Sequence, residues 1–196
     1  MNRENNDIYS GLSHAAWGYF FLHFDFNLNN VSIFPRFVGW LLLLSACAKL
    51  SGQRRDLALL RPLAVLLAAW NALDWLLSWT GGDADGHVLF LDLLLAVAGL
   101  YFHFQFLTDM AALAERYQPE GAGLDGKLRR RRTVYVVLTT LFALLGDLLA
   151  ALPEPGGELL AMGMIVTALI AAVLIMAALF RLRRCFREKE TGQSAA

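Results

Sequence analysis

The sequence is poor in charged residues and in cysteine, and it carries no net charge. Only 17% of its 196 residues are charged, against about 25% in soluble domains, whereas 57% are apolar. Seventeen Lys and Arg balance seventeen Asp and Glu, and the lack of excess positive charge argues against nucleic acid as a partner. Cys47 and Cys185 are too few for a disulfide framework and have neither zinc-site nor CxxC spacing. The composition therefore predicts an integral membrane protein.

Apolar stretches long enough to cross the hydrocarbon core as helices, about 20 residues each, occur six times. They run from Ile8 to Leu28, Val31 to Leu50, Leu57 to Trp79, His87 to Leu107, Thr133 to Leu152 and Leu159 to Phe180. None alternates as a barrel strand does, so we expect an all-α polytopic bundle of six transmembrane helices. The spans leave no room for a separate soluble domain, and residues 181–196 are expected to form a basic cytoplasmic tail.

The loops between these spans differ strongly in positive charge. With both termini in the cytoplasm, sixteen of the seventeen Lys and Arg residues lie on the inner side, and only Arg36 lies outside. This asymmetry predicts cytoplasmic termini and places both cysteines in a reducing compartment as free thiols. The run from Arg129 to Arg132 is interpreted as a topology anchor, with a binding patch for anionic lipid as the alternative.

Besides Asp25 near the end of the first span, three aspartates lie inside the predicted spans, where each ionisable group costs about 2.5–3.5 kcal/mol on insertion scales. Asp74, Asp92 and Asp147 each lie five residues from the outer end of a span. At 1.5 Å per residue, all three are expected at one level, about 7–8 Å below the outer boundary. His23 and Asp25 approach the same height near the end of the first span.

These residues predict an outward-facing acidic pocket that binds a cation or a small cationic or zwitterionic solute. Asn71 and Asp74 share a stripe that should face the bundle, and Arg36 is the one cation available at this level. The alternative is an interhelical hydrogen-bond network in which Asn71, Ser78 and Thr140 bond the acids. The expected ligand-binding residues are Asp74, Asp92, Asp147, Arg36, Asn71, His23 and Asp25.

Other functional classes are weaker interpretations of the same sequence. A non-catalytic membrane scaffold or regulatory subunit that contacts another membrane protein is the second hypothesis, and an intramembrane metalloenzyme is the third. The four histidines lack i, i+4 and HExxH spacing, although His23 could still join aspartates from other helices. His103 is expected at the inner end of the fourth span, and the neighbours Ser13 and His14 diverge by about 100° on a helix. No catalytic residue is predicted, and the sequence does not identify a cofactor or a metal.

The first hairpin carries a recognisable set of short motifs. Phe24-Asp25-Phe26-Asn27 is followed by Ile33-Phe34-Pro35 and then by Gly39-Trp40. This string resembles the first hairpin of a functionally uncharacterised group of small multi-span membrane proteins of Gram-positive bacteria, although that group often has an acid where this chain has Arg36. The resemblance implies a bacterial plasma (inner) membrane and no particular activity. In size and topology the chain also resembles the substrate-capturing subunits of energy-coupling vitamin importers.

Overall fold

The computed structural model describes residues 3–24, 27–28, 31–32, 35–79, 89–150 and 156–193. Within these ranges the chain is helical apart from one antiparallel hairpin of two-residue strands, β1 and β2, in which Asn27 pairs with Ser32. The all-α class predicted from the sequence is therefore confirmed. The elements are α1 (Arg3–His23), β1 (Asn27–Leu28), β2 (Val31–Ser32), α2 (Arg36–Leu50), α3 (Asp56–Leu59), α4 (Arg61–Ser78), α5 (Leu89–Tyr117), α6 (Leu124–Ala150) and α7 (Gly156–Gln193).

Three helical segments of the described chain are long and apolar enough to cross a membrane. They are Asp56–Ser78, Phe90–Tyr117 and Gly156–Glu190. Large apolar side chains on these segments point away from the protein interior: Phe90 is 75% exposed and Leu159 is 70% exposed. Such surfaces are stable against acyl chains and not against water, so the protein contacts the lipid bilayer.

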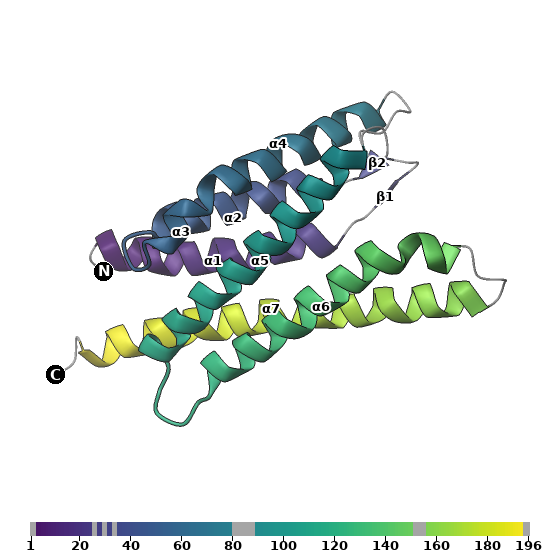
Figure 1. Cartoon of the computed structure of the whole chain (residues 1–196). Helices are drawn as coiled ribbons and strands as arrows, with labels where there is room; N and C mark the ends of the chain where they lie inside the picture. The colour runs from purple at the N-terminus through teal and green to yellow at the C-terminus, as the bar shows by residue number, and fades with distance from the viewer. Residues whose placement is uncertain are drawn as a thin grey trace.

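The long helices run side by side, with both chain termini at the same end of the molecule (Figure 1). α1 packs between α2 and α7, α2 also packs on α4, and α6 packs between α5 and α7. The end that holds the termini is tied together by Gln53, whose side chain bonds Glu4 on α1 at 2.9 Å, and Arg116 at 3.0 Å and Tyr117 at 2.8 Å on α5. The loop after α2 and the C-terminal end of α5 therefore lie beside the N-terminus.

Glycines allow a close contact between α1 and α2. A Cβ atom added at Gly39 would lie 2.9 Å from the backbone oxygen of Gly18 and 2.8 Å from Leu22 Cγ. A Cβ atom added at Gly11 would similarly lie 2.8 Å from Leu50 Cγ. Only residues without a side chain permit this approach, so these glycines fix the spacing of the first two helices.

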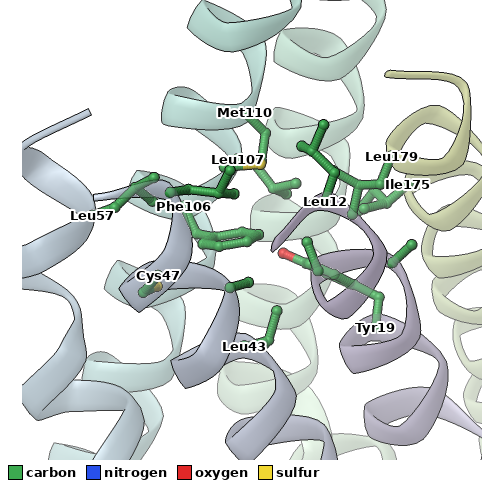
Figure 2. Packing of buried hydrophobic residues seen from close by; sticks show 14 of the residues in the cluster. Leu12, Tyr19, Leu43, Cys47, Leu57, Phe106, Leu107, Met110, Ile175 and Leu179 are labelled. Carbon is green, nitrogen blue, oxygen red and sulfur yellow. The ribbon is translucent and has the colours of Figure 1, made fainter. Parts of the chain in front are cut away.

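The interior is filled by apolar side chains from several helices, as Figure 2 shows. Phe106, Leu107 and Met110 of α5 are fully buried against Leu12 of α1 and Leu43 of α2. Ile175 and Leu179 of α7 belong to the same cluster, so the core joins the first, middle and last parts of the chain. Cys47 and Cys185 are both buried free thiols, as the sequence predicts.

Helix ends differ from the ends of the predicted spans. α1 begins at Arg3 and ends at His23 instead of extending to Leu28, and the β1–β2 hairpin occupies the residues predicted to finish the first span and begin the second. The residue before a proline is disfavoured in the helical region, so α2 starts only after Pro35. At the other ends, α5 continues to Tyr117 and α7 to Gln193, because Arg, Lys and Glu extend helices beyond their apolar portions.

Candidate functional site

A cavity of about 640 Å³ lies among α2, α4, α5 and α6. Much of its wall is apolar and includes the rings of Trp40 and Trp70. A small number of polar groups on an apolar wall is typical of small-molecule sites. The polar side chains that line the cavity are Arg36, Asn71, Asp92, His103, Tyr135 and Thr139.

Opposite charges lie at one end of this cavity. Arg36 is the first residue of α2, and Asp92 lies in the first turn of α5. Asn71, from α4, adds an amide to the same cavity. Asp92 precedes His103 on α5 by eleven residues, which is about 16 Å of helix. The cavity is therefore elongated, with charged groups at one end and His103 at the other.

The structure brings together some of the seven predicted site residues. Arg36, Asn71 and Asp92 line the cavity, whereas Asp74 lies on α4 outside the lining set. Asn71 donates a hydrogen bond to the Leu67 carbonyl of its own helix at 2.8 Å. Asp25 and the side chain of Asp147 lie outside the described residues. The predicted convergence of three aspartates thus remains a prediction.

His103 sits near the middle of α5, which continues to Tyr117 beyond the predicted span. Its side chain is 7% exposed, and Nδ1 lies 3.0 Å from the hydroxyl of Tyr19 on α1. The Trp40 and Tyr135 rings pack on the imidazole with centroid distances of 5.2 Å each. Within the described chain, Tyr19 is the only hydrogen-bond partner of His103, and Nε2 is left for the cavity that the ring lines.

His23, the last residue of α1, belongs to the wall behind this cavity. Its Nδ1 lies 2.8 Å from the Tyr19 carbonyl, and its Nε2 lies 2.8 Å from the hydroxyl of Tyr135. A carbonyl only accepts hydrogen bonds, so Nδ1 carries the proton and Tyr135 donates to Nε2. His23 therefore orients Tyr135, which lines the cavity. Sequence reasoning placed His23 near the site and missed both tyrosines, because aromatic residues are common in apolar helices and nothing in the spacing pairs them.

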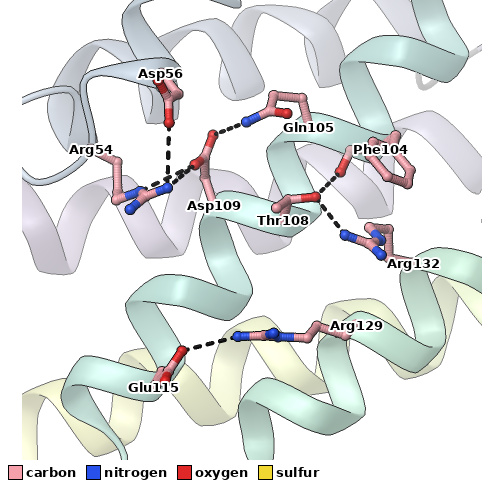
Figure 3. A network of polar contacts seen from close by, with 9 residues as sticks. All are labelled: Arg54, Asp56, Phe104, Gln105, Thr108, Asp109, Glu115, Arg129 and Arg132. Atoms are coloured by element: carbon pink, nitrogen blue, oxygen red, sulfur yellow. Dashed lines mark hydrogen bonds and ion pairs between the residues drawn. The ribbon is translucent and has the colours of Figure 1, made fainter.

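A buried ion pair holds the end of the molecule nearest the termini, and Figure 3 shows its geometry. Asp109 of α5 is fully buried, and its Oδ1 accepts bonds from Arg54 Nε at 3.2 Å and from an Arg54 terminal nitrogen at 3.1 Å. Gln105, one turn earlier, donates to Oδ2 at 3.3 Å. Residue spacing along the chain does not predict this pair. An acid one helical turn after a glutamine is a weak signal, and its partner lies 55 residues away.

The arginine run at the start of α6 makes contacts within the protein (Figure 3). Arg132 donates to Thr108 Oγ1 at 2.7 Å and stacks on the Phe104 ring, with 4.2 Å from Cζ to the ring centroid. Arg129 pairs with Glu115 at 3.0 Å. Both arginines therefore attach α6 to α5. This packing role was part of neither prediction for the run, the topology anchor or the lipid-binding patch.

Metal ligands do not cluster in the part of the chain that the structure describes, and one serine there lies within hydrogen-bond distance of a histidine. Within those ranges, no group of three or more His, Cys, Asp and Glu residues could hold a metal ion. His14 Nδ1 bonds Ser45 at 2.9 Å, and Arg183 bonds the Ser13 hydroxyl at 3.0 Å.

Comparison with known proteins adds no family assignment. No protein-family model, no curated protein and no solved structure matches the chain. The function therefore has to be argued from the cavity and its chemistry.

Proposed function

We propose that the protein binds, and in the membrane transports, a small zwitterionic solute with an apolar body through the cavity among α2, α4, α5 and α6. The observation that carries this proposal is the presence of Arg36 and Asp92 on one elongated, largely apolar cavity of about 640 Å³. That volume lies within the range of about 300–1,000 Å³ that is typical of small-molecule sites.

The charges define the chemistry of the solute. A guanidinium binds a carboxylate with two parallel hydrogen bonds, whereas a carboxylate accepts bonds from an ammonium group. Arg36 is thus suited to the acidic group of the solute and Asp92 to its basic group, with Asn71 as a further hydrogen-bonding partner. The apolar wall, including Trp40 and Trp70, is suited to the rest of the molecule.

The proposed setting is the plasma membrane of a bacterium, crossed six times, with both termini in the cytoplasm. Three of the proposed spans are the segments that are long and apolar enough by themselves to cross a membrane. The remaining three are α1, α2 and α6. The cationic loops support this orientation because Arg54, Arg116 and Lys189 belong to the end that holds the termini. In this orientation Arg36 and Asp92 face the outside.

The experiment compares three related compounds by the thermal stability of the purified protein in detergent. L-phenylalanine carries both charges, phenethylamine lacks the carboxylate, and 3-phenylpropionate lacks the ammonium group. Ligand at 100 times its Kd stabilises a protein by about 2.7 kcal/mol, which is readily seen as a shift in Tm. We expect L-phenylalanine to stabilise the wild type more than either analogue.

The matched variants assign each charge. In Arg36→Gln, L-phenylalanine and phenethylamine should stabilise equally, because the carboxylate has lost its partner. In Asp92→Asn, L-phenylalanine and 3-phenylpropionate should become equal for the corresponding reason. Asp74→Asn is the control, since Asp74 lies outside the cavity lining, and it should preserve the preference for the zwitterion. Equal shifts with all three compounds, or no shift with any, would contradict the proposed function.

A further inference from the structure

The deep end of the cavity contains a histidine with one ring nitrogen committed and one available. His103 is 7% exposed and lines the cavity, and its Nδ1 lies 3.0 Å from the Tyr19 hydroxyl. Tyr19 itself is only 1% exposed. The protonation of the available nitrogen decides what the cavity offers to a solute, so the direction of the bond between Tyr19 and His103 is decisive.

Burial of Tyr19 sets that direction. A buried hydroxyl that fails to donate its proton loses free energy. Within the described part of the chain, the one acceptor at hydrogen-bond distance from the Tyr19 hydroxyl is His103 Nδ1. Tyr19 therefore donates to Nδ1, and a neutral imidazole that accepts at Nδ1 carries its proton on Nε2.

The hydrogen bond between His23 and Tyr135 leaves His103 as the hydrogen-bond donor at the deep end of the cavity. His23 Nδ1 donates to the Tyr19 carbonyl, so its Nε2 accepts the proton of Tyr135 at 2.8 Å. The Tyr135 hydroxyl is thereby committed as a donor and turns only lone pairs to the cavity. The rings of Trp40 and Tyr135 flank the His103 imidazole, with centroid distances of 5.2 Å each.

We infer that the Nε2–H of His103 is a fixed hydrogen-bond donor that selects solutes whose inner end is an uncharged acceptor. This inference rests on the proposed function, because it concerns the end of the solute opposite its charged groups. About 16 Å of helix separates Asp92 from His103, so an elongated solute spans the cavity, with its zwitterionic head at Arg36 and Asp92 and a carbonyl, ether or hydroxyl oxygen at His103. Tyr19 is a positioning residue, which acts by fixing the tautomer.

The tautomer is measurable without any ligand. Solution NMR of histidine-labelled protein at pH 7 gives the nitrogen-15 chemical shifts of both ring nitrogens, and His103→Gln identifies the His103 signals by their loss. We expect a protonated Nε2 and an unprotonated Nδ1. In Tyr19→Phe, the fixed preference should be replaced by a mixture of tautomers. A protonated Nδ1 in the wild type, or an imidazolium, would overturn the inference.

Selection is measured with two zwitterions of nearly equal shape, O-(2-methoxyethyl)-L-tyrosine and O-butyl-L-tyrosine, which differ by a distal ether oxygen in place of a methylene group and are long enough to extend from Asp92 towards His103. We expect the wild type to bind the methoxyethyl compound about 5-fold more tightly, since one neutral hydrogen bond contributes about 1 kcal/mol. His103→Leu and Tyr19→Phe should reduce this preference towards unity while still binding both compounds.

The possible failures are distinguishable. Equal affinity of the wild type for both compounds would overturn selection by His103 and leave the zwitterion site intact. Absence of binding by both compounds and by L-phenylalanine would contradict the proposed function, and selection would fall with it even if the expected tautomer were found.

Discussion

Substituting Gly39 by alanine tests the close packing between α1 and α2. The new Cβ atom would lie 2.9 Å from the Gly18 backbone oxygen and 2.8 Å from Leu22 Cγ. The Leu22 side chain can rotate away from the new methyl group, but the Gly18 backbone oxygen can move only if the two helices separate. Gly39→Ala should therefore force α1 and α2 apart, and Gly18→Ala should act in the same way, with its Cβ atom 3.1 Å from the Gly39 oxygen.

The expected magnitude combines two opposing terms. Overpacking of a close contact costs about 1–3 kcal/mol, whereas replacing glycine by alanine inside a helix contributes about 0.5–1 kcal/mol of stability. For Gly39→Ala the net loss should be about 1–2 kcal/mol. Gly163 on α7 is the matched control, because a Cβ atom added there meets nothing within 4 Å. Gly163→Ala keeps only the favourable term and should gain about 0.5–1 kcal/mol.

Reversible unfolding in mixed micelles of a mild detergent and sodium dodecyl sulfate gives both free energies under the same conditions. The difference between the two variants should be about 2 kcal/mol or more, with Gly39→Ala the less stable. If both alanine variants changed stability by the same amount and in the same direction, the glycine contact between α1 and α2 would be refuted.

Two further perturbations follow from named contacts. Asp109→Ala removes a fully buried partner of Arg54 and should lower the free energy of unfolding by about 2–3 kcal/mol. Glu115→Gln, in an exposed ion pair, is the control and should lower it by less than about 1 kcal/mol. Equal losses for the two variants in micelle unfolding would contradict the buried pair. The hydrogen bond from Gln118 holds the pKa of Asp125 below its usual value in the folded protein. Asp125 therefore stabilises the fold at pH values above its unfolded-state pKa of about 3.9. This stabilisation is lost as the pH falls through the lower folded-state pKa. An NMR titration should show this pKa rising in Gln118→Ala, and an unchanged pKa would count against the bond.

Hydropathy predicted the helical class well because it reports which segments tolerate lipid, and helices are the structures that satisfy their own backbone there. It predicted helix ends poorly for the same reason. The predicted fifth span begins at Thr133, but α6 begins at Leu124, since the intervening arginines suit a helix as well as they suit the headgroup region. The sequence marks where a helix leaves the lipid and does not mark where it stops.

The depth of a site residue within the membrane could be predicted from its position along a span. The direction of its side chain around the helix and its hydrogen-bond partner could not. Arg36 and Asp92 lie near helix ends and line one cavity. Their positions along the chain predict that they lie near the same end of the helices. Asn71 lines the cavity but Asp74 does not, because side chains three residues apart share a helix face yet still differ by about 60° around the axis, and hydropathy does not reveal that difference. The bond between Tyr19 and His103 joins residues 84 positions apart, which no local spacing reveals.

The most direct test of a water-filled cavity open to the outside is labelling of two adjacent engineered cysteines on α5. Ala96 lines the cavity, whereas Val97 is 57% exposed on the helix surface and does not line it. Cys47 and Cys185 are buried, so the wild type provides the background. In intact cells, a charged, membrane-impermeant thiol reagent should label Ala96→Cys and leave Val97→Cys unlabelled, because thiolates form in water and not among acyl chains. Equal labelling of the two variants, or labelling of Val97→Cys alone, would contradict the cavity on which the proposed function depends.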